Sequence, residues 1–167
     1  MPLPTELYEV FKLDEGERPG INFENLTGVE VIDIYAHVKE HCEELSSAYL
    51  AWSNKLERDV EVRSFNNPAI EVVSGEIDPF CHYISTYSNN GLNVTNVSIY
   101  LFPESVEIFY DVRDVKSNEE AESILHFVKK IYSLCTNCIP FFAEENGRKR
   151  EEVFQCLLVE FLSAEQA

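Results

Sequence analysis

Two cysteines in the stretch "SLCTNCIP", Cys135 and Cys138, have the spacing of metal-binding and redox-active thiol pairs. A structural zinc site needs four ligands, and His37 and His41 would have to supply the other two. The apolar pattern places both histidines off the buried side of their expected helix, and nothing in the sequence brings them to the cysteines. We therefore predict that the chain binds no metal and no cofactor.

The position of the cysteine pair also argues against a redox role. A helix N-terminus lowers thiol pKa values, whereas Cys135 follows the C-terminal end of an expected helix. The chain has five cysteines, an odd number, and its first residues lack the basic and apolar segments of a secretory signal. No apolar run has the length of a membrane span. We expect reduced thiols that pack a helix end, and a cytoplasmic location.

Other catalytic arrangements find little support. Cys81 and His82 are conceivable as nucleophile and base with Asp78 nearby, but adjacent strand residues point to opposite faces of a sheet. The glycines lie singly, so there is no glycine-rich phosphate loop. With 30 Asp and Glu residues, a carboxylate pair of the glycosidase type can always be drawn and carries no information. The sequence predicts a protein that is not an enzyme.

Charge is the strongest signal in the chain. The 30 acidic residues face 13 Lys and Arg residues, which gives a formal net charge of −17. Such a surface repels nucleic acid and anionic lipid, and it attracts basic proteins over long range. We expect a basic protein partner, with no direct contact to nucleic acid or membrane. The oligomeric state is left open.

Apolar periodicity predicts the first elements. We expect a single domain over residues 1–167, with residues 1–28 as a docked N-terminal arm. Apolar residues then recur every three or four positions from Val31 to Leu56, which predicts one long helix of about six turns. Trp52 is in register with this apolar stripe and is predicted to lie in the core.

After Glu57 the apolar period changes to two, which is typical of strands. The expected strands are "DVEVRSF", "AIEVVSG", "CHYISTY", "VSIYLF" and "VEIFYDV". Asn90 and Gly91 tolerate positive φ angles and mark a turn between the third and fourth of these segments. The last two segments form an antiparallel hairpin, because only a short connection separates them.

Two helices complete the expected fold. Ser117 and Glu120 have the spacing of a capping box, which starts a helix that reaches Tyr132. A last helix begins near Lys149 and is expected to bury Val153, Phe154, Leu157, Leu158 and Phe161. The fold class is therefore α+β: an antiparallel sheet of about five strands, with the long N-terminal helix and the two C-terminal helices packed mainly on one face.

Two acidic groups are candidates for the partner-binding surface. One lies on the exposed side of the expected long helix, where residues four apart stack on one face. The other follows that helix, where strand alternation turns its carboxylates away from the core together. The candidates are Glu40, Glu43 and Glu44 in the first group, and Glu57, Asp59 and Glu61 in the second. The acids at residues 119–122 are explained by helix capping and need no partner.

Size, charge, the strand-strand-helix run from Val97 to Tyr132 and the lack of a catalytic motif resemble the small acidic immunity proteins that bacteria make against their own secreted toxins. The resemblance implies a non-catalytic protein that neutralises a cognate toxin, often a basic nuclease whose phosphate-binding cleft is plugged by carboxylates. An aromatic anchor would supply the desolvated centre of that interface. The resemblance carries over no individual functional residue.

Two other partners fit the same charge. A DNA mimic of phage or plasmid origin uses carboxylates in place of phosphates, and it needs them in rows that resemble duplex DNA. An adaptor or chaperone for a basic client needs only a concentrated acidic patch, as an immunity protein does. The sequence does not separate these alternatives.

Overall fold

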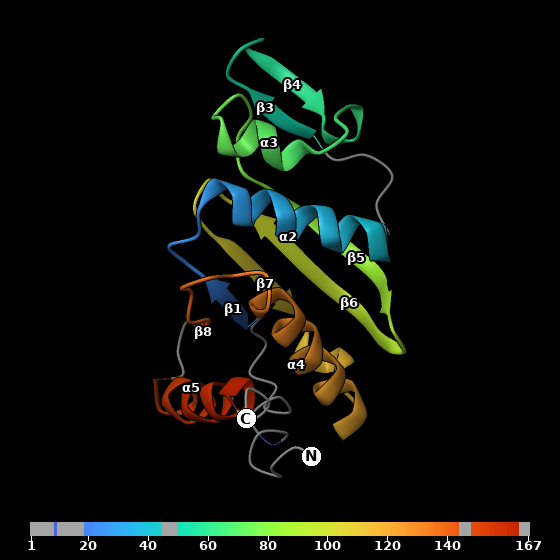
Figure 1. The fold of residues 1–167 in the computed structure, drawn as a ribbon. Coiled ribbons are helices and arrows are strands. Elements are labelled where there is room, and N and C mark those ends of the chain that lie inside the picture. Colours follow the sequence, from blue (N-terminus) through green and yellow to red (C-terminus); the bar gives the residue numbers. More distant parts are fainter. Residues whose placement is uncertain (1–8, 10–18, 45–49, 144–147, 164–167) are drawn as a thin grey trace.

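The computed structural model describes Glu9 and residues 19–44, 50–143 and 148–163 (Figure 1). Its elements are β1 (Gly20–Phe23), α2 (Gly28–His41), β2 (Cys42–Glu44), β3 (Leu50–Ser53), β4 (Arg58–Glu61), α3 (Pro68–Val73), β5 (Phe80–Asn89), β6 (Leu92–Leu101), β7 (Val106–Tyr110), α4 (Asn118–Tyr132), β8 (Phe141–Ala143) and α5 (Arg148–Ser163). Six strands form one sheet in the order β2-β5-β6-β7-β1-β8, and β3 pairs with β4 in a second sheet. The predicted α+β class and the antiparallel sheet are confirmed.

Strand β1 lies inside the main sheet. It pairs antiparallel with β7 on one side and with β8 on the other. Ile21 and Phe23 are fully buried, whereas Asn22 points to the opposite face as strand alternation requires. Within the expected arm at residues 1–28, the described part from residue 20 to 23 is therefore an interior strand. Residues 1–8 and 10–18 lie outside the described residues.

Strands β5, β6 and β7 form the expected meander. Asn90 and Gly91 join β5 to β6 with φ angles of 50° and 84°. Two central residues with positive φ are the mark of a type I′ turn, whose twist matches that of the flanking strands. The amide of Phe102 donates to the carbonyl of Ser105 at 2.9 Å and closes the tight turn between β6 and β7. The strand and turn predictions for this region are confirmed.

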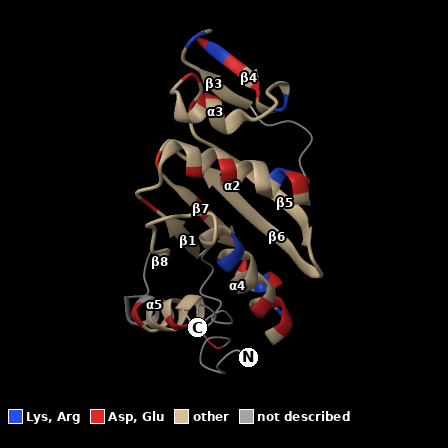
Figure 2. Ribbon diagram, viewed as in Figure 1, with Lys and Arg blue, Asp and Glu red and all other residues tan. Residues whose placement is uncertain are grey.

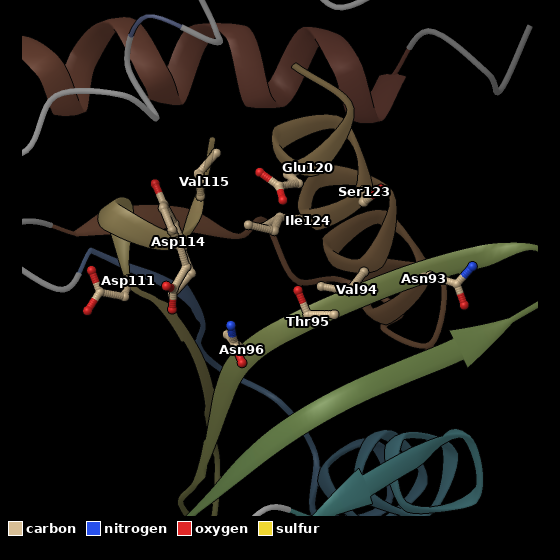
Figure 3. A pocket seen from close by; sticks show the side chains of 11 residues that line it. Asn93, Val94, Thr95, Asn96, Asp111, Asp114, Val115, Glu120, Ser123 and Ile124 are labelled. Atoms are coloured by element: carbon tan, nitrogen blue, oxygen red, sulfur yellow. The ribbon is translucent and has the colours of Figure 1, made fainter. Parts of the chain in front are cut away.

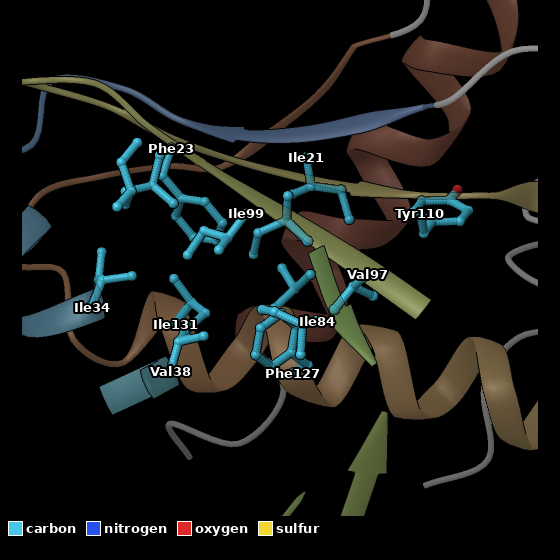
Figure 4. Close-up of a cluster of buried hydrophobic side chains, with 14 of the residues drawn as sticks. Ile21, Phe23, Ile34, Val38, Ile84, Val97, Ile99, Tyr110, Phe127 and Ile131 are labelled. Atoms are coloured by element: carbon cyan, nitrogen blue, oxygen red, sulfur yellow. The ribbon is translucent and has the colours of Figure 1, made fainter. Parts of the chain in front are cut away.

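The core fills the space between the main sheet and two helices. Alternate residues of the strands, among them Ile84, Val97 and Ile99, are at most 1% exposed. Figure 4 shows these side chains pointing toward residues of α2 and α4, with Val38 and Phe127 among them. Helices α2 and α4 lie over the same side of the sheet in Figure 1.

Helix α4 begins where the sequence predicts. The Ser117 side chain accepts from the Glu120 amide, and the Glu120 carboxylate accepts from the Ser117 amide at 3.0 Å. The helix reaches Tyr132 as predicted, and it buries a stripe of residues from Ala121 to Ile131. Helix α5 buries Phe154, but Val153 is 49% exposed, so that part of the predicted stripe is wrong. The reason is that α5 packs beside β8, where Phe154 stacks on Phe142.

The long helix predicted from Val31 to Leu56 is wrong. Helix α2 ends at His41, and Cys42–Glu44 continue as β2, paired with β5. An unpaired edge of β5 would leave backbone donors and acceptors unsatisfied, and β2 covers part of it. This pairing overrides the apolar spacing of the sequence, which helix α2 follows at the buried residues Val31, Ile34 and Val38. Residues 45–49 of the expected helix lie outside the described residues.

The predicted strand at "AIEVVSG" is also wrong, because Pro68–Val73 form the short helix α3. Asn67 is its N-cap, and its side chain accepts from the Ala69 amide at 3.1 Å. Proline suits the first helical position because its missing N–H has no partner there in any case. The segment "DVEVRSF" was expected as one strand, but β4 ends at Glu61 and a 3-10 turn, Val62–Ser64, follows.

A close approach between α2 and α3 generates a testable prediction. A Cβ atom on Gly28 would lie 2.4 Å from Cγ1 of Val73. Because the branched valine side chain is stiff, we expect Gly28→Ala to lower the free energy of unfolding by ~1–3 kcal/mol. An open helix position would instead gain roughly 0.5–1 kcal/mol from the same change. Urea unfolding should show that Gly28→Ala with Val73→Ala recovers stability relative to Gly28→Ala alone; a stabilised single variant contradicts this contact.

Candidate functional site

The β3–β4 hairpin presents one exposed face that combines apolar and acidic side chains. Leu50 stands directly opposite Glu61, and Trp52 stands directly opposite Asp59. Residues opposite each other in an antiparallel pair project to the same face, so these four side chains share one surface. Leu50 is 61% exposed and Trp52 is 45% exposed. We call this surface, Leu50, Trp52, Asp59 and Glu61, the hairpin face.

The hairpin is held by backbone hydrogen bonds to the segment after α3. The amide of Asp78 donates to the Trp52 carbonyl at 2.9 Å, and the amide of Asn54 donates to the Glu76 carbonyl at 2.9 Å. Ser53 forms a β-bridge with Ile77 and is itself only 4% exposed. The backbone under Trp52 is therefore fixed, while its indole ring is left partly in solvent.

The core prediction for Trp52 is wrong. Because α2 ends at His41, Trp52 belongs to a strand, and strand alternation sends Ala51 inward and Trp52 outward. The sequence does contain a signal for this hairpin. Leu50 and Trp52 alternate with small residues, and the turn at residues 54–57, three of whose four residues are polar, separates them from the period-two segment of β4.

The second acidic group lies on and beside this face. Asp59 and Glu61 belong to the hairpin face, and Glu57 is exposed in the turn. The expected alternation is present, because Val62 is buried and Val60 is half-buried. Arg58 stands opposite Ser53 and therefore projects to the other side of the hairpin. The charges that share a face with Trp52 are acidic, although Figure 2 shows both signs along β4.

The first acidic group is divided between two elements. Glu40 is exposed near the end of α2, and Glu43 is exposed on β2. Glu44 is also in β2, and its side chain lies outside the described part. The predicted stacking of Glu40 and Glu44 on one helix face is wrong, because the helix ends between them. The strands that carry residues of the two groups belong to different sheets, since β2 pairs with β5 and β4 pairs with β3.

The cysteine pair follows α4 as expected, and all five cysteines are present as thiols. A hydrogen bond between the two side chains raises the pKa of Cys135 and lowers the pKa of Cys138. His37 and His41 do not approach them but meet Tyr87, whose hydroxyl lies 2.9 Å from Nε2 of His37. No cluster of three or more potential metal ligands occurs within the described ranges.

Glu30 holds the segment from Cys135 to Cys138 at the start of α2. Its carboxylate accepts from the Thr27 amide at 2.7 Å and from the Thr136 amide at 2.6 Å, across a separation of 106 residues. These two backbone donors lower the pKa of Glu30 to about 2. The Glu30 carboxylate therefore caps the start of α2 and also holds Thr136, the residue that follows Cys135.

The side chains of Cys81 and His82, considered above as nucleophile and base, lie on opposite faces of the sheet. His82 is 4% exposed on the core side of β5, where its Nδ1 lies 3.2 Å from the Tyr35 hydroxyl. Cys81 projects to the opposite face by strand alternation. The prediction that His82 is a residue of the sheet is confirmed.

A small acidic cavity lies between β6, the segment after β7 and α4 (Figure 3). Its volume is about 30 Å³, enough for about two water molecules. Asp111 in its wall forms an ion pair with Arg113, and Glu120 is engaged in the capping box. These carboxylates have structural roles, and the cavity is too small for an organic ligand.

Comparisons with protein-family models, with curated proteins and with solved structures found no match for this chain. Within the part of the chain that the structure describes, no helix combines the length and apolar character that a membrane crossing requires.

The exposure of Trp52 predicts a small effect on stability. We expect Trp52→Ala to lower the free energy of unfolding by about 1 kcal/mol, because much of the indole already contacts water. Phe127→Ala serves as the buried control, since Phe127 is fully buried, and should cost ~3–5 kcal/mol. Urea unfolding of both variants tests this difference. Equal losses for the two variants contradict an exposed Trp52.

The low pKa of Glu30 predicts a pH-dependent contribution to stability. A carboxylate with a lowered pKa stabilises the fold above the ordinary value of 4.5, and this contribution is lost as the pH falls toward about 2. Glu30→Gln should therefore cost about 1 kcal/mol at neutral pH. The difference from the wild type should shrink through that acidic range in urea unfolding. Glu104→Gln, at an exposed carboxylate, is the charge-matched control; a constant difference at all pH values contradicts the assignment.

Proposed function

We propose that this chain is a non-catalytic acidic binding protein that occludes a basic protein partner, as an immunity protein does when it neutralises a toxin. The observation that carries the proposal is the exposed Trp52 directly opposite Asp59 on a braced hairpin. Tryptophan is enriched among the few residues that supply most of the energy of protein interfaces. Carboxylates beside it suit a partner with Lys and Arg around an apolar contact.

The hairpin face suits an arginine side chain in particular. A guanidinium placed over the indole of Trp52 gains cation–π attraction, and its N–H groups can reach the carboxylate of Asp59. Burial of the exposed parts of Trp52 and Leu50 adds a hydrophobic contribution. The hydrogen bonds to the Trp52 and Asn54 backbone reduce the ordering cost of binding, because the hairpin is already held in place.

The remaining carboxylates act mainly at a distance. Glu40 and Glu43 lie on α2 and β2, away from the paired strands of the hairpin. A net charge of −17 steers a basic partner toward the protein and raises the association rate at low salt. At physiological ionic strength the screening length is about 8 Å, so only carboxylates close to the contact affect the final complex.

Contacts of the described histidines and cysteines bear on the non-catalytic part of the proposal. Among the described residues, the histidines and cysteines that sequence reasoning considered for chemistry are separated by the sheet or held in packing contacts. His82 lies in the core beside Tyr35 and Phe80. His37 is engaged with Tyr87.

Affinity capture with the full chain tests the proposal, followed by binding kinetics with the captured protein. We expect a basic protein whose complex with Trp52→Ala dissociates faster, with a loss of at least about 2 kcal/mol. Asp59→Lys combined with Glu61→Lys should slow association and flatten its salt dependence. Ile139→Ala is the control for an exposed apolar side chain. Glu152→Lys combined with Glu160→Lys is the matched charge control on α5.

The outcomes separate the alternatives. A partner with toxic activity that the chain suppresses supports the immunity function. A captured DNA-binding enzyme that duplex DNA displaces identifies a DNA mimic, and a client without activity identifies an adaptor. If the hairpin variants bind as the wild type does, the site is elsewhere. If no basic protein is captured, the occlusion proposal itself fails.

A further inference from the structure

A second surface has the opposite charge. A cavity of about 530 Å³ opens between the C-terminal half of α4 and the tip of the β5–β6 hairpin. Its lining includes Lys129, Lys130 and His126, together with Asn89 and Ser133, and no described residue of the lining carries a carboxylate. In a chain with 30 acids and 13 Lys and Arg residues, a lining of this composition is unusual. We call this cavity the lysine pocket.

Lys130 is available for a ligand. Within the described residues, no ion pair or hydrogen bond involves its amino group. Lys129 is held differently, because its Nζ lies 5.1 Å from the ring centre of Phe161 and 3.5 Å from the Phe161 carbonyl. His126 lies 3.7 Å from Glu122 and packs edge-on against Phe161. The helix dipole favours a lysine in the last turn of a helix. This position does not engage the Lys130 amino group in a hydrogen bond or ion pair with another described residue.

The polar groups behind the pocket are ordered by a partly buried hydrogen-bond network. The Tyr87 hydroxyl lies 2.9 Å from Nε2 of His37, and the side-chain amide of Asn89 donates to that hydroxyl at 3.3 Å. Burial lowers the pKa of His37, with smaller contributions from His41 and Lys130, which favours the neutral ring as the acceptor for Tyr87. The same Asn89 nitrogen also lies 3.5 Å from Nε2 of His37, so this network engages Asn89 twice.

From these observations we propose that the lysine pocket binds a small organic phosphate. Lysine amino groups bind phosphate as point charges, and Lys129 and Lys130 place two of them on the lining of the pocket. The volume is within the range of ligand pockets and is far larger than an inorganic phosphate needs. Leu92, which is half-buried, supplies an apolar part of the lining for the organic part of the ligand. This inference is independent of the proposed function of the hairpin face.

Titration of the full chain with phenyl phosphate, followed by amide chemical shifts, tests this assignment. At an ionic strength of about 0.15 M the screening length is about 8 Å, so the distant carboxylates have little effect. We expect saturable shifts at Gly91, Lys130 and Ser133. Lys130→Ala should weaken binding about tenfold or more and leave the melting temperature nearly unchanged, because its amino group forms no hydrogen bond or ion pair with another described residue.

Lys116→Ala is the matched control, since it removes the same charge from an exposed position before the other end of α4. It should leave binding unchanged. Equal weakening by the two variants, or no saturable shift in the pocket, overturns the proposal. Inorganic phosphate that binds as tightly as phenyl phosphate overturns the assignment to an organic ligand. Phenol that binds as tightly overturns the assignment to a phosphate.

Discussion

The main sheet has one apolar face, and burial of that face is the constraint on which the rest of the fold depends. Its strands alternate, so Ile84, Val97 and Ile99 gather on one side and must be shielded from water. Helices α2 and α4 provide this cover. Once α2 lies there, β2 can continue from its end and pair with the edge of β5.

The same helix connects the core to the hairpin. Gly28 at the start of α2 allows close contact with Val73 of α3, and the segment after α3 holds the hairpin by backbone hydrogen bonds to Trp52 and Asn54. The exposed tryptophan therefore stands on a support that is tied to the core. At the other end of α2, His37 reaches Tyr87 and orders the polar wall of the lysine pocket. One helix thus positions both candidate surfaces.

The two surfaces differ in the kind of ligand that their charge favours. The hairpin face presents carboxylates and an indole ring to solvent, which suits the cationic groups of a large partner. The lysine pocket is concave, and no described residue of its lining carries a carboxylate, which suits a small anion. Opposite charges on separate elements allow the two surfaces to act without competing for one ligand. Under the proposed function, the many other carboxylates add long-range steering of a basic partner.

Local signals in the sequence determined a large part of this structure. Asn90 and Gly91 specified a turn because few residues accept positive φ, and Ser117 with Glu120 specified a helix start because their side chains satisfy nearby amides. Alternation also sufficed to turn Asp59 and Glu61 outward. The net charge and the α+β class followed from composition and order alone.

Tertiary pairing decided the rest. The apolar spacing from Val31 to Leu56 fits a helix, yet the backbone groups at the edge of β5 take Cys42–Glu44 into a strand. That single change moves Trp52 from a predicted core position to an exposed one. The lysine pocket likewise joins residues 89–92 to residues 126–133, which are distant in sequence. Such sites depend on which segments meet, and periodicity along one segment carries no information about its partners.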